Sequence, residues 1–276
     1  MRLFKRNIDH FSILKLFKIT DQVSSETFPM KSLILDTIES VTKLTNIQPT
    51  HFNLNYSKDY SGLTGFKSAL SSISEITFCQ VSFAHADKKC MLMIANPMVN
   101  QTKKPINSSI DIYIELPIGF SDDDRLITLA NDLLINFEFD YGYIHQFPQG
   151  YSVVTERKMD GGVFSKSDSV TDFDNIWTFH SVGMNRGYLK NFYSINFLNT
   201  SHLDNQPLNK IVSSFGIKKR ISDKILMWTI SNEDIDILKK LPTVKKYVIE
   251  SAKSENEFIK SEVAKSFYAL MKLQHM

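Results

Sequence analysis

The chain has 276 residues, a formal net charge of +2 at pH 7, and 42% hydrophobic and 22% charged residues. This composition is typical of a folded protein and excludes a largely disordered one, while the length allows one large domain or two ordinary ones. No run of about 18 uncharged apolar residues occurs, which argues against a membrane-spanning helix.

The N-terminal part of the chain predicts a strand, a helix and a hairpin. FSILKLFKIT reads as a strand, and a helix is expected from Pro29 to Asn46, where apolar residues recur at helical spacing. The sequences ITFCQVSFAHA and CMLMIANP predict a hairpin that contains both cysteines, Cys79 and Cys90. Cysteines in apolar surroundings are typical of buried thiols, and free thiols favour a reducing cytoplasm.

A second strand, helix and strand follow a loop-like stretch at residues 97–109. SIDIYIELPI alternates apolar and polar residues as a half-buried strand does. Ser121 is expected to cap a helix whose first turn holds Asp122, Asp123 and Asp124, and FDYGYIHQF follows as a strand. The helix is expected to bury one stripe of residues: Leu126, Leu129, Ala130, Leu133, Leu134 and Phe137.

These elements predict an α+β fold in which helices pack on a mixed or antiparallel sheet. The shared order of elements allows two similar strand-helix-strand halves within one architecture. We expect a single domain over residues 1–276. The alternative places a boundary in the loop-like stretch, which gives an N-terminal half of 1–104 and a C-terminal half of 105–276.

The C-terminal part predicts further short elements. LDNQPLNKIVSSFG predicts a helix, and ILMWTIS predicts a buried strand with Trp228 in the core. Ser231 or Asn232 is expected to cap a helix that ends near Leu241. A docked terminal helix is expected from Ser254 to Leu273, where apolar residues share one face.

Charge is segregated along the sequence. Between Asp111 and Asp174, acidic residues outnumber basic ones by thirteen to four, whereas residues 216–276 carry twelve basic and eight acidic residues. A surface of one sign attracts partners of the opposite sign if its groups share a face. The acidic block would oppose phosphate and no nucleic-acid motif accompanies the basic part, so direct nucleic-acid binding is not expected.

The acidic and aromatic residues in this block are the candidates for binding a partner. Carboxylates in the first turn of a helix stabilise it, so the three aspartates have a structural reading beside the functional one. The aromatic residues of FDYGYIHQF are core residues or, if exposed, anchors for a partner, and Asp160 falls in an expected surface loop. The candidate contact residues are Asp122, Asp123, Asp124, Tyr141, Tyr143, His145 and Asp160.

The sequence contains no recognisable reaction centre. The serine elbow, the phosphate-binding loop and histidine spacings typical of metal sites are all missing, so we expect no metal, no cofactor and no enzymatic activity. One alternative is an enzyme for a small molecule whose site forms only in three dimensions, with His145, Glu156 or His180 transferring protons. Another is a self-associating scaffold, and the sequence does not define the oligomeric state.

Three segments resemble bacterial immunity proteins of type VI secretion and polymorphic toxin systems. They are ELPIGF with DDDRLITLANDLLINFEFDYGYIHQF, then GYLKNFYSINFLN, then ILMWTIS, and they cover roughly residues 110–231. In that group a helix leads into a strand with a Gly-Tyr pair, here Gly142 and Tyr143. The resemblance implies a cytoplasmic, non-catalytic α+β protein that binds a cognate toxin or effector and blocks it by occlusion.

Overall fold

The computed structural model describes residues 10–20, 26–96, 108–120, 122–152, 157–158, 187–243 and 247–248. These residues form the expected α+β fold around a ten-stranded antiparallel sheet with the strand order β11-β12-β10-β7-β1-β6-β5-β4-β2-β3. Its strands are β1 (His10–Thr20), β2 (Pro49–Leu54), β3 (Lys58–Tyr60), β4 (Phe78–His85), β5 (Lys88–Ala95), β6 (Ser108–Glu115), β7 (Tyr141–Pro148), β10 (Ile195–Asn199), β11 (Ile217–Arg220) and β12 (Ile225–Thr229). A separate ribbon consists of β8 (Tyr151–Ser152) and β9 (Arg157–Lys158). The helices are α2 (Met30–Thr45), α3 (Leu63–Ser72), α4 (Asp123–Asn136), α6 (Thr200–Asp204), α7 (Gln206–Ser214) and α8 (Asn232–Leu238).

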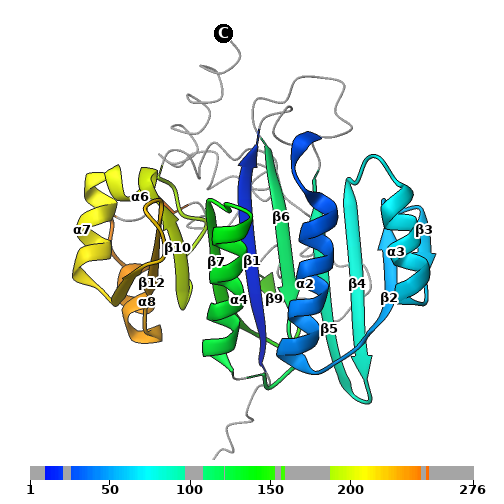
Figure 1. Ribbon diagram of the computed structural model, residues 1–276. Coiled ribbons are helices and arrows are strands. Elements are labelled where there is room, and N and C mark those ends of the chain that lie inside the picture. The colour runs from blue at the N-terminus through cyan, green and yellow to red at the C-terminus, as the bar shows by residue number, and fades with distance from the viewer. Residues whose placement is uncertain are drawn as a thin grey trace, which may run out of the picture.

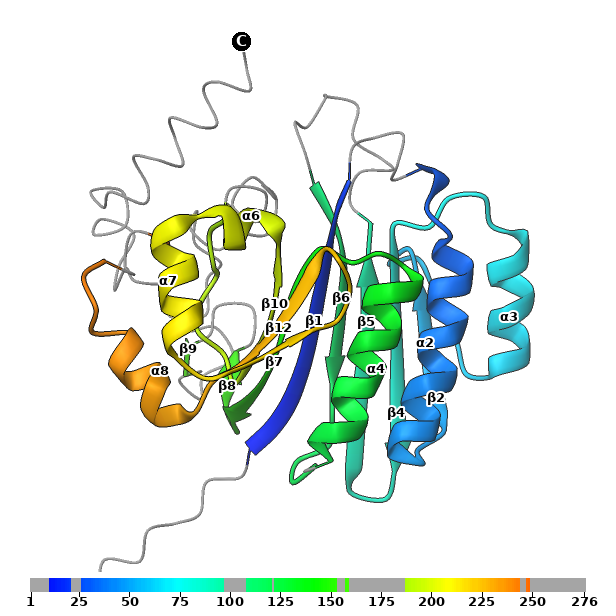
Figure 2. The ribbon, with the colours of Figure 1, turned by 60° about the vertical axis from the view of Figure 1, so that its left-hand side comes forward.

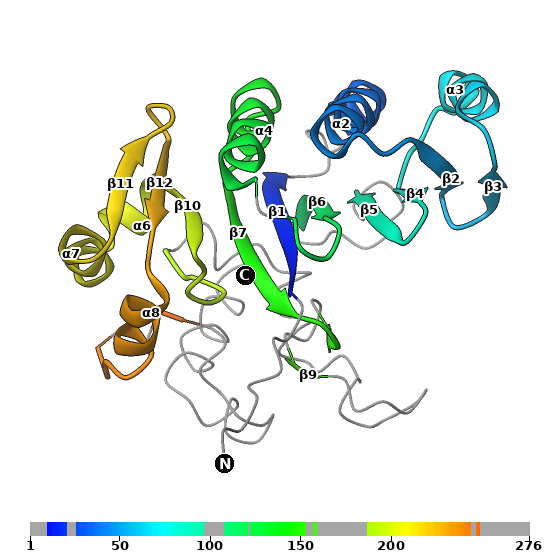
Figure 3. The same ribbon diagram turned by 90° about the horizontal axis from the view of Figure 1, so that it is seen from below.

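Helices α2, α3 and α4 cover one face of the sheet. Figure 1 shows them in front of the strands, and Figure 3 shows them in a row on one side. Between helices and sheet lies an apolar core to which every second strand residue contributes, such as Leu14 and Leu16 of β1 and Ile110, Ile112 and Ile114 of β6. The strand alternation therefore decides which side chains face the helices.

The apolar stripes of α2 and α4 explain where these helices lie. α2 starts directly after Pro29, and it ends at Asn46, which adopts the left-handed conformation with φ 56°. The stripe predicted for α4 is buried. The predicted cap is wrong, because Asp122 rather than Ser121 is the N-cap and its side chain accepts a hydrogen bond from the Arg125 N–H.

Each half of the chain contains a strand-helix-strand crossover whose two strands point the same way. β6 and β7 are both antiparallel to β1, which lies between them. β6, β5 and β4 separate β1 from β2, so α2 connects strands that lie farther apart in the sheet than those joined by α4. A strand from the N-terminal half thus lies between strands of the C-terminal half, and the loop-like stretch at 97–109 connects β5 to β6, which pair directly.

At one end of the sheet, helices also lie on its other face. A second apolar core joins β7, β10 and β12 to α7 and α8, which Figure 2 shows across the sheet from α4 and α2. Tyr141, Tyr143, Tyr193 and Trp228 are among its fully buried members. Trp228 is therefore a core residue as predicted, and its indole N–H donates to the Phe215 carbonyl at 2.8 Å.

Gly142 marks a close approach of β7 to β1. A Cβ at this position would lie 2.4 Å from Leu16 Cδ2 and 2.5 Å from the Lys15 carbonyl oxygen. A residue without a side chain is therefore required for these two strands to pair at this register. The backbone that Gly142 allows to come so close is β1 of the same chain.

The C-terminal part differs from expectation in several bounds. The helix expected from LDNQPLNKIVSSFG is α7, which begins only at Gln206, after the short helix α6, and the unexpected strand β11 follows it. The Ser231 side chain caps α8 as predicted, but the helix already ends at Leu238. The terminal helix expected at 254–273 lies outside the described residues. None of the helices in the described ranges has the length and apolar character needed to cross a bilayer.

Candidate functional site

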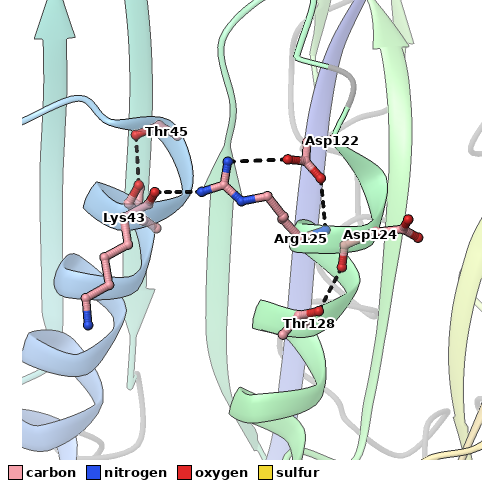
Figure 4. Close-up of polar contacts among 7 residues, drawn as sticks. Lys43, Thr45, Asp122, Asp124, Arg125 and Thr128 are labelled. Atoms are coloured by element: carbon pink, nitrogen blue, oxygen red, sulfur yellow. Dashed lines mark hydrogen bonds and ion pairs between the residues drawn. The ribbon is translucent and has the colours of Figure 1, made fainter.

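The N-terminal end of α4 gathers three aspartates beside the C-terminal end of α2 (Figure 4). The Asp122 carboxylate accepts a hydrogen bond from the Arg125 N–H at 3.1 Å and pairs with the Arg125 guanidinium at 3.3 Å. The guanidinium also donates to the Lys43 carbonyl, 2.7 Å away. Asp122 therefore has a structural role, since it caps α4 and holds the arginine that connects α4 to α2.

Asp123 and Asp124 are exposed, and their carboxylates form no ion pair or hydrogen bond within the described ranges of the chain. Figure 4 shows the Asp124 carboxylate pointing away from Arg125 and α2. Burial raises the pKa of Asp123, and the neighbouring Asp124 and Asp122 carboxylates raise it further. Negative charges are crowded at this helix end, so a cationic group from outside would relieve their repulsion.

An exposed isoleucine lies next to these carboxylates in the sequence. Ile118 is 49% exposed in the turn that joins β6 to α4. The Gly119 N–H donates to the His10 carbonyl at 3.1 Å, which ties this turn to strand β1. We name Ile118 together with Asp122–Asp124 the acidic turn. It combines an apolar side chain, on a backbone that is tied to β1, with carboxylates that follow closely in the sequence.

Tyr141 and Tyr143 do not reach the surface. Tyr143 stacks on Tyr193 with ring centroids 3.7 Å apart, and Tyr141 stacks on His202 at 5.2 Å. Both tyrosine side chains are fully buried, and the Tyr141 hydroxyl accepts a hydrogen bond from the Lys190 N–H. The expectation that these rings anchor a partner is therefore corrected, because later residues of the chain fold over β7 and make them part of the core.

His145 is half-buried on the same side of β7. Its Nδ1 accepts a hydrogen bond from the Ser194 N–H at 3.3 Å and lies 3.0 Å from the Ser194 hydroxyl oxygen. Its ring lies edge-on to those of Phe147 and Tyr193. The imidazole thus connects β7 to the segment that precedes β10. Three other candidates lie outside the described residues: Glu156, Asp160 and His180.

The acidic residues of the central block do not share one face of the sheet. The isoleucines of β6 face the helix layer, so Asp111, Tyr113 and Glu115, which alternate with them, point to the opposite side. Asp122–Asp124 belong to the helix side. Among the described residues of this block, the acidic side chains therefore lie on two separate surfaces.

A pocket of about 280 Å³ lies on the sheet face that carries Asp111 and Glu115. Sequence reasoning missed it, because its residues come from strands that pair across long stretches of chain. Lys15 of β1 lies opposite Tyr113 of β6, which in turn lies opposite Met93 of β5. The lining residues are Lys15, Phe78, Met91, Met93, Ala95, Asp111, Tyr113, Glu115 and Tyr151.

Two carboxylates in this pocket are held in different ways. Burial raises the pKa of Asp111 to about 6, although the Lys15 charge and a hydrogen bond from the Ser109 hydroxyl lower it in part. The Tyr113 hydroxyl donates to Glu115 at 2.7 Å. Burial raises the pKa of Tyr113, and the adjacent Glu115 charge raises it further, so this phenol is a hydrogen-bond donor at neutral pH.

The described residues contain no group of three histidine, cysteine, aspartate or glutamate side chains that could hold a metal ion. Cys79 and Cys90 are buried free thiols, and burial raises the pKa of each to about 12. In comparisons with known proteins, no family model and no curated protein matches the chain.

Proposed function

We propose that this chain is a non-catalytic immunity protein of the bacterial cytoplasm, which neutralises a cognate toxin or effector by binding it at the acidic turn. The observation that carries the proposal is that exposed Ile118 is followed closely in the sequence by the carboxylates of Asp123 and Asp124, which have no ion-pair partner among the residues that the structure describes. Interfaces commonly combine an apolar anchor with a charged rim, and this turn supplies both. The two reduced cysteines fit a cytoplasmic location.

The two parts of the acidic turn would have different roles in binding. Exposed carboxylates of one sign attract a basic surface and speed the first encounter. An apolar side chain that becomes buried in the complex slows dissociation. Because the turn is tied to β1, little conformational freedom is lost when a partner binds it. The partner expected from this chemistry is a protein with a basic surface and an apolar hollow.

The proposal is tested with the product of a neighbouring toxin gene and two variants of the chain. Asp123→Lys combined with Asp124→Lys should slow association about tenfold or more at low salt, and the difference should disappear near 1 M salt, where the Debye length is about 3 Å. Ile118→Ala should leave association unchanged and increase the dissociation rate about fivefold or more. Stopped-flow fluorescence measures both rates.

A matched control distinguishes the effect of the acidic turn on association from the effect of the total charge. Asp36→Lys combined with Asp204→Lys changes the charge by the same amount at exposed positions on α2 and α6. The association rate of this control at low salt should be close to that of the wild type and differ only by the small effect of the changed total charge. Equal association of wild type and the Asp123→Lys, Asp124→Lys variant at low salt would remove the acidic turn from the interface. A neighbouring product that neither binds nor harms cells would argue against the function itself.

A further inference from the structure

The pocket on the sheet face opposite α2, α3 and α4 has an uneven distribution of charge. Lys15 Nζ lies 5.0 Å from the centroid of the Phe17 ring, and Phe17 lies opposite Asp111 in the sheet. The positive charge of Lys15 is thus directed towards the Asp111 end, where it lowers the pKa of that carboxyl group. The opposite end holds Glu115, whose direct neighbours across the sheet are the apolar residues Ile13 and Met91.

Each carboxylate in the pocket uses one oxygen and leaves the other open. Asp111 Oδ1 accepts from the Ser109 hydroxyl at 2.6 Å, and Glu115 Oε2 accepts from the Tyr113 hydroxyl. Within the described parts of the chain, no donor reaches the second oxygen of either group. The charges of Lys15 and Lys190 both lower the pKa of Asp111, so two bases act on the carboxylate at that end of the pocket. Glu115 lines the other end and is the carboxylate left for a cation from outside.

We infer that this pocket binds one organic cation, an alkylammonium or alkylguanidinium group, with its charge at Glu115 and its stem along Met91 and Met93. Methionine side chains adapt to irregular apolar ligands, and the aromatic residues Tyr113 and Tyr151 also line the pocket. A half-buried carboxylate such as Glu115 gains from a cation that also donates a hydrogen bond to it.

The size of the pocket limits the ligand to about the size of an amino-acid side chain. A molecule of liquid water occupies roughly 30 Å³, so the pocket has room for about nine groups of that size. A short alkylamine fits, as does a lysine or arginine side chain of another protein, whereas a dinucleotide does not. The pocket and the acidic turn lie on opposite sides of the sheet, so this inference does not rest on the proposed function.

The test compares a charged probe with a neutral alcohol whose alkyl chain is one carbon longer. Wild-type protein with ¹³C-methyl methionine is titrated with n-butylammonium chloride and, separately, with n-pentanol, while NMR follows the Met91 and Met93 methyl signals. We expect butylammonium to cause saturable shifts of these methyl signals. Pentanol should bind about tenfold or more weakly, because only the ammonium group can form a hydrogen bond between charged groups with Glu115. This comparison needs no variant and is unaffected by changes in folding.

Two variants then locate the charge. Glu115→Gln should weaken butylammonium binding about tenfold to a hundredfold, while the control Glu75→Gln, at an exposed position outside the pocket, should not change it. A blocked Gly-Lys-Gly peptide is titrated in parallel with butylammonium. Tighter binding of the peptide would indicate a lysine side chain of another protein as the ligand, and tighter binding of butylammonium would indicate a free amine. Equal binding of pentanol and butylammonium, equal binding to Glu115→Gln, or no saturable shift at Met91 and Met93 would each overturn the inference.

Discussion

Replacing Gly142 with alanine tests whether β7 and β1 are packed as closely as the structure indicates. The new methyl group would lie 2.4 Å from Leu16 Cδ2 and 2.5 Å from the Lys15 carbonyl oxygen. The leucine side chain can rotate away, but the carbonyl belongs to the backbone of β1, which pairs with both β6 and β7. Relief of the clash therefore requires a shift of strands within the sheet.

The expected loss of stability is large compared with an ordinary substitution. Overpacking in a filled core costs about 1 to 3 kcal/mol, and each ladder hydrogen bond weakened by a strand shift adds about 1 kcal/mol. We therefore expect Gly142→Ala to lower the free energy of unfolding by roughly 3 to 5 kcal/mol, a large part of the roughly 5 to 15 kcal/mol typical of a folded protein. Denaturation in urea measures the change.

Gly65→Ala is the matched control for this measurement. Gly65 lies in α3, and a Cβ there meets no atom within 4 Å. Alanine is the better helix former, so this variant should unfold at a slightly higher urea concentration, with a gain of up to about 1 kcal/mol. If Gly142→Ala were within about 0.5 kcal/mol of the wild type, a change usual for surface positions, the close approach of β7 to β1 would be refuted.

Three further predictions concern single groups. Asp122→Ala should lower the free energy of unfolding by about 1 kcal/mol, because α4 loses its N-cap, and an unchanged urea midpoint would contradict that role. The Asp111 carboxyl should titrate near pH 6 by ¹³C NMR, above its ordinary 3.8. The folded state thus binds this proton more tightly than the unfolded state. The contribution of protonated Asp111 to the free energy of unfolding is therefore full below pH 3.8 and is lost as the pH rises through 6. Asp111→Asn should therefore gain stability relative to wild type between pH 4 and pH 7, and a constant difference would count against the burial of this group. Cys79 and Cys90 should react with a thiol reagent at pH 8 only after unfolding, since burial raises the pKa of both to about 12, and rapid reaction of the native protein would show that they are accessible.

The elements that sequence reasoning located correctly are those with a strong local pattern. The apolar stripe of α4 and the alternation of β6 each depend on neighbours within a few positions, so the sequence alone defines which side chains share a face. The cap of α4 was misplaced by one residue, from Ser121 to Asp122, because both residue types suit that position. Local rules cannot choose between adjacent candidates of equal preference.

The candidate site was harder to predict, because burial depends on residues far away in the chain. Tyr141 and Tyr143 alternate along the strand and so share one side of it, but only the stacking of His202 on Tyr141 and of Tyr193 on Tyr143 decides that this side is buried. The sheet pocket has the same origin, since the pairing of Lys15 with Tyr113 joins strands nearly a hundred residues apart. No local pattern in the sequence encodes that pairing.

The most direct test of the proposed function measures the activity of the neighbouring toxin as the purified chain is added in increasing amounts. Our account predicts that inhibition is complete at a fixed stoichiometric ratio, and that the Asp123→Lys, Asp124→Lys variant needs longer to inhibit at low salt. Inhibition by a small fraction of an equivalent would instead indicate turnover, and an unaffected toxin would show that the chain does not act by covering it.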